Sequence, residues 1–163
     1  MIDYNIKDVL FFIVTIVLAM VLMIIPVPQW LLYWQPNWVL LVIVFWFCVA
    51  PEMISLFWFW SIGLFQDLLL STPLGMSAII YAVVVFFLSR MSSRLSQYPQ
   101  WQQLTVIFMV SVFQALFSYM ILHFSGQSVK IIMLLPAIIL NCLIWNLLFK
   151  AMYIVWRRRL RVY

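Results

Sequence analysis

The charged residues of this chain lie almost entirely outside six long apolar runs, and this separation most limits how the chain can fold. Prolines and polar residues bound the runs, which cover about residues 9–25, 37–50, 53–70, 76–89, 104–124 and 131–156. Only 8% of the 163 residues are charged and 68% are hydrophobic, whereas about a quarter of an average soluble domain is charged. The pattern therefore predicts an integral membrane protein.

The lengths of the runs predict an all-α, polytopic fold. A membrane-spanning helix needs roughly 20 residues at about 1.5 Å each, which the last two runs supply easily. We expect six transmembrane helices in a single integral membrane domain over residues 1–163. Segment 37–50 is short, so a five-helix count stays open as an alternative, with 37–50 and 53–70 forming one re-entrant pair.

The basic residues predict the orientation of the chain. The tail at 157–161 carries four arginines, and basic loops face the cytoplasm. Six crossings then place eight of the nine basic residues on the cytoplasmic side, leave only Lys130 outside, and put both termini in the cytoplasm. The net charge of +5 thus indicates contact with membrane lipids rather than nucleic acid.

One acid, Asp67, lies inside an apolar run, where a carboxylate costs roughly 2.5–3.5 kcal/mol at mid-membrane. Gly63, Asp67 and Ser71 fall at i, i+4 and i+8, on one helical face. Asp67 could accept N–H bonds from the start of the next helix, whose dipole favours an anion. Two interpretations remain open: a structural tie within the helical hairpin, or part of a polar site for a ligand, an ion or a partner's helix.

Other polar side chains also lie within the predicted helices. Ser111, Gln114 and Ser118 share one face, and Asn141 lies inside the last run; such groups commonly bond between membrane helices. Together with Asp67, Gln114 and Asn141 could line the cavity of a small-molecule carrier, which is the alternative function. No catalytic set, metal-ligand cluster or phosphate-binding loop is present, so the sequence predicts neither an enzyme nor a cofactor.

Three stretches resemble a known family. They are "PNWVLLVIVFW" from Pro36 to Trp46, "GLFQDLLLSTPLG" from Gly63 to Gly75, and "LNCLIWNLLF" from Leu140 to Phe149. Their order and spacing are typical of MreD, the rod shape-determining membrane protein family. The resemblance extends over nearly the whole chain, and its most specific part is the acid followed by Leu74 and Gly75.

The resemblance implies a non-enzymatic component of the cell-elongation machinery in a bacterial inner membrane. The implied partners are an MreC-like protein with one membrane helix and, in a wider complex, MreB, RodA and its transpeptidase. The family is also similar in architecture to the substrate-binding subunits of vitamin transporters, a likeness of fold that transfers no ligand. We expect nine residues to form a helix-packing or partner surface, together with the turn after it and the start of the second helix. They are Gly63, Asp67, Ser71, Pro73, Leu74, Gly75, Pro36, Asn37 and Asn141.

Overall fold

The regular secondary structure in the described part of the chain is helical. The computed structural model describes residues 6–26, 28, 34–51, 55–90, 99–126 and 134–160. Six helices lie within these ranges: α1 (Ile6–Ile24), α2 (Trp38–Val49), α3 (Leu56–Leu70), α4 (Met76–Arg90), α5 (Gln100–Phe124) and α6 (Leu135–Leu160). The prediction of six helices is confirmed, and each helix overlaps one of the apolar runs.

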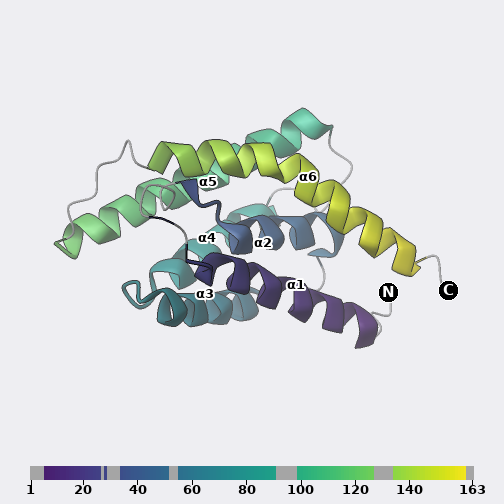
Figure 1. Ribbon diagram of the computed structural model, residues 1–163, viewed down its shortest axis with the longest axis horizontal. Coiled ribbons are helices and arrows are strands. Elements are labelled where there is room, and N and C mark those ends of the chain that lie inside the picture. The colour runs from purple at the N-terminus through teal and green to yellow at the C-terminus, as the bar shows by residue number, and fades with distance from the viewer. Residues whose placement is uncertain are drawn as a thin grey trace.

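The helices form a bundle along the long axis of the molecule. Figure 1 shows α5 and α6 along one side, α1 and α3 along the opposite side, and α2 between them. The closest packing is between neighbours in sequence: α3 against α4, α5 against α6 and α1 against α2. The start of α1 and the end of α6 lie at the same end of the bundle (Figure 1).

Helix α2 forms the centre of the bundle. Every residue from Val39 to Cys48 is buried, and a helix that is apolar on all sides needs an apolar environment on all sides. Its 12 residues extend over only about 18 Å, less than the roughly 30 Å of a bilayer core. The other helices enclose it, and the two residues that directly flank it, Asn37 and Ala50, are buried in protein rather than exposed to lipid.

An aromatic cluster joins α1, α2 and α6. The ring centroid of Trp46 lies 5.7 Å from that of Phe11, 5.2 Å from that of Phe12 and 5.2 Å from that of Trp156. All three pairs meet edge to face, the arrangement that aromatic quadrupoles favour. The indole N–H of Trp46 donates to the Thr15 hydroxyl at 2.9 Å, so this fully buried ring leaves no polar atom unpaired.

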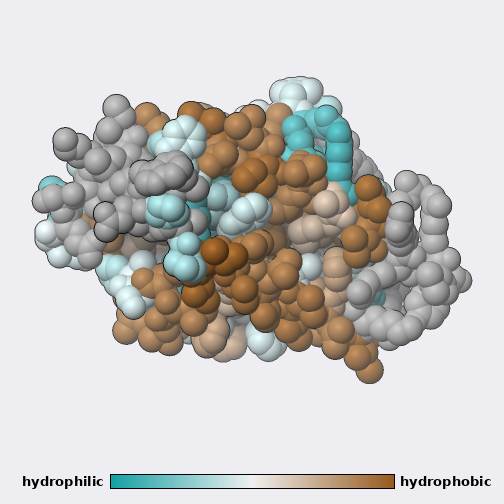
Figure 2. Space-filling view, in the orientation of Figure 1, coloured by the Kyte–Doolittle hydropathy of each residue, from teal (hydrophilic) through white to brown (hydrophobic). Residues whose placement is uncertain are grey.

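The outer surface of the bundle is apolar. Figure 2 shows hydrophobic residues covering most of the visible face that is not grey. Exposed Leu18, Phe57, Phe87, Met109 and Leu147, for example, come from five different helices. An apolar surface of this extent suits lipid rather than water. By length and composition, α5 and α6 are the two helices in the described part of the chain that could each cross a membrane, while the other four are shorter apolar helices.

Candidate functional site

Helices α3 and α4 approach each other most closely at Gly63. A Cβ atom at this position would lie 2.4 Å from the Cα of Ala78 and 2.5 Å from its backbone nitrogen. Real Cβ atoms do not come so close to backbone, so only glycine fits between these two helices. The close approach brings the next turn of α3 directly against the start of α4.

The Asp67 side chain caps the start of α4 from the end of α3. Its Oδ2 accepts the Gly75 N–H at 2.9 Å, and the Ser77 N–H lies 3.0 Å from both carboxylate oxygens. Its Oδ1 also accepts the Thr72 hydroxyl at 2.9 Å. The first N–H groups of a helix have no partner inside the helix, and an anion there is further favoured by the helix dipole. The fully buried carboxylate is thus stabilised by three donors.

The turn between α3 and α4 is shaped by two residues of positive φ. Ser71 adopts the left-handed conformation with φ 53°, and Gly75 has φ 91°. The backbone N–H groups of Ser71 and Thr72 both bond to the Asp67 carbonyl, which closes the end of α3. The Met76 N–H then bonds to the Pro73 carbonyl at 3.1 Å, which leads the chain into α4.

Ser71 does not share the helical face of Gly63 and Asp67, contrary to the sequence prediction. Helix α3 ends at Leu70, and the left-handed backbone at Ser71 turns its side chain out to an exposed position. The i, i+4, i+8 pattern holds only while a helix continues. Leu74 is also exposed, at 71% of its surface, so both residues lie on the outside of the turn.

A second polar cluster joins α2, α5 and α6. The Oδ1 of Asn141 accepts the backbone N–H of Asn37 at 3.0 Å, and its Nδ2 donates to the Ser111 hydroxyl at 3.0 Å. Asn37 is the N-cap of α2, with its own Oδ1 accepting the Leu40 N–H at 3.0 Å. Buried Pro36 precedes it. The structure thus brings together two positions that the sequence indicated separately, Asn37 and Asn141.

The cluster extends to α3 and α4 through residues that sequence reasoning missed. The Tyr81 hydroxyl lies 2.6 Å from the Gln66 Oε1 and 3.1 Å from the Asn37 Oδ1. The Gln66 Nε2 lies 3.4 Å from the Met23 sulfur, which adds α1. Gln66 and Tyr81 are polar groups inside apolar runs, and that was the available signal, because such groups must find partners in a low-dielectric interior.

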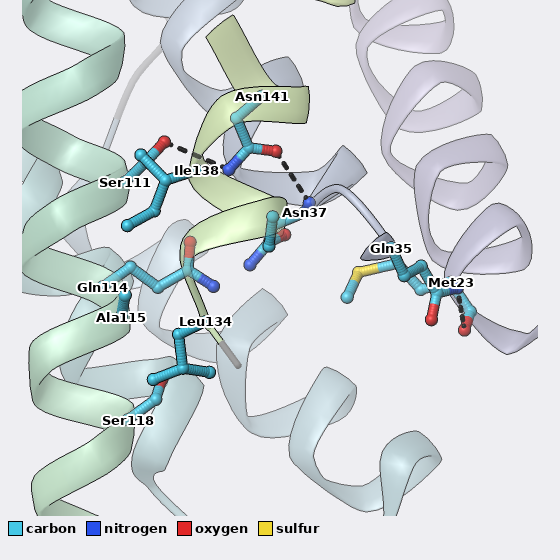
Figure 3. A pocket seen from close by; sticks show the side chains of 11 residues that line it. Met23, Gln35, Asn37, Ser111, Gln114, Ala115, Ser118, Leu134, Ile138 and Asn141 are labelled. Atoms are coloured by element: carbon cyan, nitrogen blue, oxygen red, sulfur yellow. Dashed lines mark hydrogen bonds between the residues drawn. The ribbon is translucent and has the colours of Figure 1, made fainter. Parts of the chain in front are cut away.

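A cavity of about 170 Å³ lies beside this cluster, between the end of α1, the start of α2, the middle of α5 and the start of α6. Figure 3 shows the side chains around it. Its lining consists of Met23, Gln35, Asn37, Ser111, Gln114, Ala115, Ser118, Leu134, Ala137, Ile138 and Asn141. Of the three residues expected in a carrier's cavity, Gln114 and Asn141 line it, while Asp67 does not and is held at the α3–α4 hairpin.

Neither cluster provides a reactive centre. Within the described ranges, no group of three or more His, Cys, Asp or Glu side chains could hold a metal ion. The Asp67 carboxylate is occupied by its three donors, and the groups around Asn141 are neutral amides and hydroxyls. The arrangement can hold helices together and can bind a polar group by hydrogen bonds.

Comparison with known proteins decides the family. A family model described as rod shape-determining protein MreD matches residues 5–159. The chain belongs to the MreD family. A protein of Haemophilus influenzae named rod shape-determining protein MreD is 29% identical over 101 residues, which are 61% of this chain and 62% of that protein. The match therefore spans less than two thirds of the relative's length. No solved structure matches the chain.

Membership in the MreD family confirms the resemblance read from the three sequence stretches. The printed description of that family names rod-shape determination. The family match covers all six helices of the bundle.

Proposed function

We propose that this protein is a membrane scaffold that maintains rod shape by organising peptidoglycan synthesis during cell elongation. The observation that carries the proposal is the MreD family match over residues 5–159. The bundle supports it: buried polar side chains form hydrogen bonds between its helices, and the helices present broad apolar surfaces. A scaffold needs such surfaces to contact other membrane proteins and needs no reactive group.

The family context supports a defined set of partners. The membrane helix of an MreC-like protein would pack against the bundle, while MreB, RodA and its transpeptidase would belong to the wider complex. Exposed apolar side chains such as Phe57 and Trp58 on α3 would provide packing area, because helices associate in lipid through van der Waals packing and interhelical hydrogen bonds.

The roles of the α3–α4 residues follow from their burial. Gly63 and Asp67 are buried against α4 and would act on a partner indirectly, by shaping the hairpin. Ser71 and Leu74 are exposed on the turn and would be free to contact a partner. Pro73 and Gly75 would set the shape of that turn.

The proposed setting is the bacterial inner membrane, crossed six times with both termini in the cytoplasm. The start of α1 and the end of α6 lie at the same end of the bundle (Figure 1), which supports an even number of crossings. Buried, 12-residue α2 would be the crossing that relies most on the surrounding helices.

Complementation tests the proposal. The chain is expressed in a rod-shaped bacterium that has been depleted of its own MreD-family protein. It carries a tag, so that an MreC-like protein bound to it can be co-purified. The proposal requires restored rods and recovery of the MreC-like protein with the tagged chain. The proposal would be refuted if the chain reached normal levels in the membrane but the cells stayed round and no MreC-like protein was recovered with it.

A further inference from the structure

The cavity beside Asn141 contains one buried polar atom without a hydrogen-bond partner among the described residues. Gln114 Oε1 is buried and has no hydrogen-bond partner in the part of the chain that the structure describes. Asn37 uses its backbone N–H and its Oδ1 in the described hydrogen bonds, and Figure 3 shows its Nδ2 pointing into the cavity. A buried acceptor without a partner costs free energy, and a ligand in the cavity that donates a hydrogen bond to it would remove that cost.

The polar groups of the lining include both donors and an acceptor. Figure 3 shows the Nδ2 of Asn37 and the Nε2 of Gln114 on the cavity side of their side chains, where both can donate to an acceptor. The buried Oε1 of Gln114 requires a donor. A hydroxyl group can donate and accept at once, so a group with several hydroxyls satisfies both requirements.

The charge of the lining residues and the size of the cavity further limit the class of ligand. None of the described residues that line the cavity is charged, and an ion in a low-dielectric site without a counter-ion is strongly disfavoured. At about 10–15 Å³ per water, the 170 Å³ would hold on the order of ten waters. That room suits a single sugar ring or a glycerol unit.

We propose that this cavity is a binding site for one small, uncharged, polyhydroxyl group, held by Asn37 and Gln114. The rest of the lining is prepared for it: Asn141 and Ser111 are held in place by their own hydrogen bonds, and Ala115 and Ile138 supply apolar contact. The group is either a free sugar or polyol, or the uncharged sugar headgroup of a lipid, since the same hydroxyls are offered by both.

The position of the cavity is compatible with either source. Figure 2 shows hydrophilic atoms interrupting the apolar surface in the part of the view where α1 ends and α2 begins, and the cavity is lined from these two places. A free sugar would arrive from water at this end of the bundle. A lipid headgroup would arrive from the interface, with its acyl chains on the apolar surface outside.

A cysteine in the cavity provides the test. Ser118 lines the cavity, so Ser118→Cys is introduced after Cys48→Ala and Cys142→Ala remove both native thiols. The full chain is placed in phosphatidylcholine nanodiscs, which leave both membrane faces accessible, and the rate of labelling by N-ethylmaleimide is measured. Glucose is the free probe, monoglucosyl diacylglycerol in the disc is the lipid probe, and glucose 6-phosphate is the charged control.

Protection of the cysteine is the expected result. Glucose should slow labelling by a factor of about 1 + [glucose]/Kd if the free sugar binds, and the glucolipid should do so if the lipid headgroup binds. Glucose 6-phosphate should protect much less. Gln114→Met should weaken the affinity of the chain for the protecting probe about fivefold to tenfold, because one or two hydrogen bonds are lost. The matched control Gln100→Met, at an exposed position on the same helix, should leave protection unchanged.

Three results would each overturn the proposal. One is unchanged labelling in the presence of both glucose and the glucolipid. Another is protection that survives Gln114→Met undiminished in a chain with an unchanged melting midpoint. The third is a cysteine at position 118 that does not react at all, because a cavity closed to a small uncharged reagent is closed to a sugar. Loss of rod-shape complementation would not bear on this result, since labelling is measured on the purified chain.

Discussion

Replacing Asp67 by leucine should strongly destabilise the bundle. The change leaves the N–H groups of Gly75 and Ser77 at the start of α4 without their acceptor. Each buried, unsatisfied donor costs about 1–3 kcal/mol, so the two together cost about 2–6 kcal/mol. The half-buried Thr72 hydroxyl can rotate toward another acceptor and adds little. This loss is a large fraction of the roughly 5–15 kcal/mol that stabilises a typical folded domain.

Asparagine at the same position should have a smaller effect. Asp67→Asn keeps one acceptor oxygen of the two that now serve Gly75, Ser77 and Thr72. Its amide nitrogen cannot accept, so at least one charge-assisted bond is lost, at about 1.5–3 kcal/mol. The expected order of stability is therefore wild type, then Asp67→Asn, then Asp67→Leu.

Reversible unfolding in mixed detergent micelles measures this order. Sodium dodecyl sulfate is titrated into the folded chain while helix content is followed by circular dichroism, and the free energy of unfolding is compared between variants. Gln100→Leu, a polar-to-leucine change at an exposed position, is the matched control and should stay within about 0.5 kcal/mol of wild type. An Asp67→Leu chain as stable as this control would refute the structural tie. If such a chain then failed to restore rods, the acid would belong to a partner surface.

Three further changes test the same geometry, each by unfolding free energy in micelles. Gly63→Ala should cost about 1–3 kcal/mol or more, because its Cβ would meet Ala78 backbone at 2.4 Å; a neutral result would contradict the close approach of α3 and α4. Ser71→Gly should stabilise the chain by about 0.5–1 kcal/mol, because relief of the left-handed φ of 53° outweighs the added freedom of the unfolded chain; destabilisation would show that the Ser71 side chain has another role. Tyr81→Phe should cost about 1–3 kcal/mol by leaving the buried Gln66 Oε1 without its donor; an unchanged midpoint would mean that the hydroxyl does not support the polar cluster.

The sequence was informative about the number of helices and about the acid. Each apolar run became one helix, since helices satisfy their own backbone groups and are therefore favoured in an apolar environment. Placed beside the turn at 71–75, Asp67 was expected near the start of the next helix, and the bonds to Gly75 and Ser77 run there. Both results depend on local spacing, which a sequence displays directly.

The spacing of residues along the sequence was misleading at the end of α3. The face shared by Gly63 and Asp67 was extended to Ser71, but α3 ends one residue earlier, at Leu70. Nothing in the run Leu68 to Ser71 marks the boundary, because leucine and serine both occur within helices. The position of the end depends on the turn and on α4 packed behind it.

By itself, the sequence determined that this protein is a bundle of apolar helices, and its motifs were sufficient to place it in the MreD family. Only the tertiary structure decided which polar groups meet. Asn37, Gln66, Tyr81, Ser111 and Asn141 come from five separate parts of the chain and form one hydrogen-bonded cluster. A sequence shows that a polar group inside an apolar run needs a partner, because leaving it unpaired costs free energy. It cannot show which partner, since that depends on how whole helices pack, and the same packing leaves the cavity between α5, α6 and the start of α2.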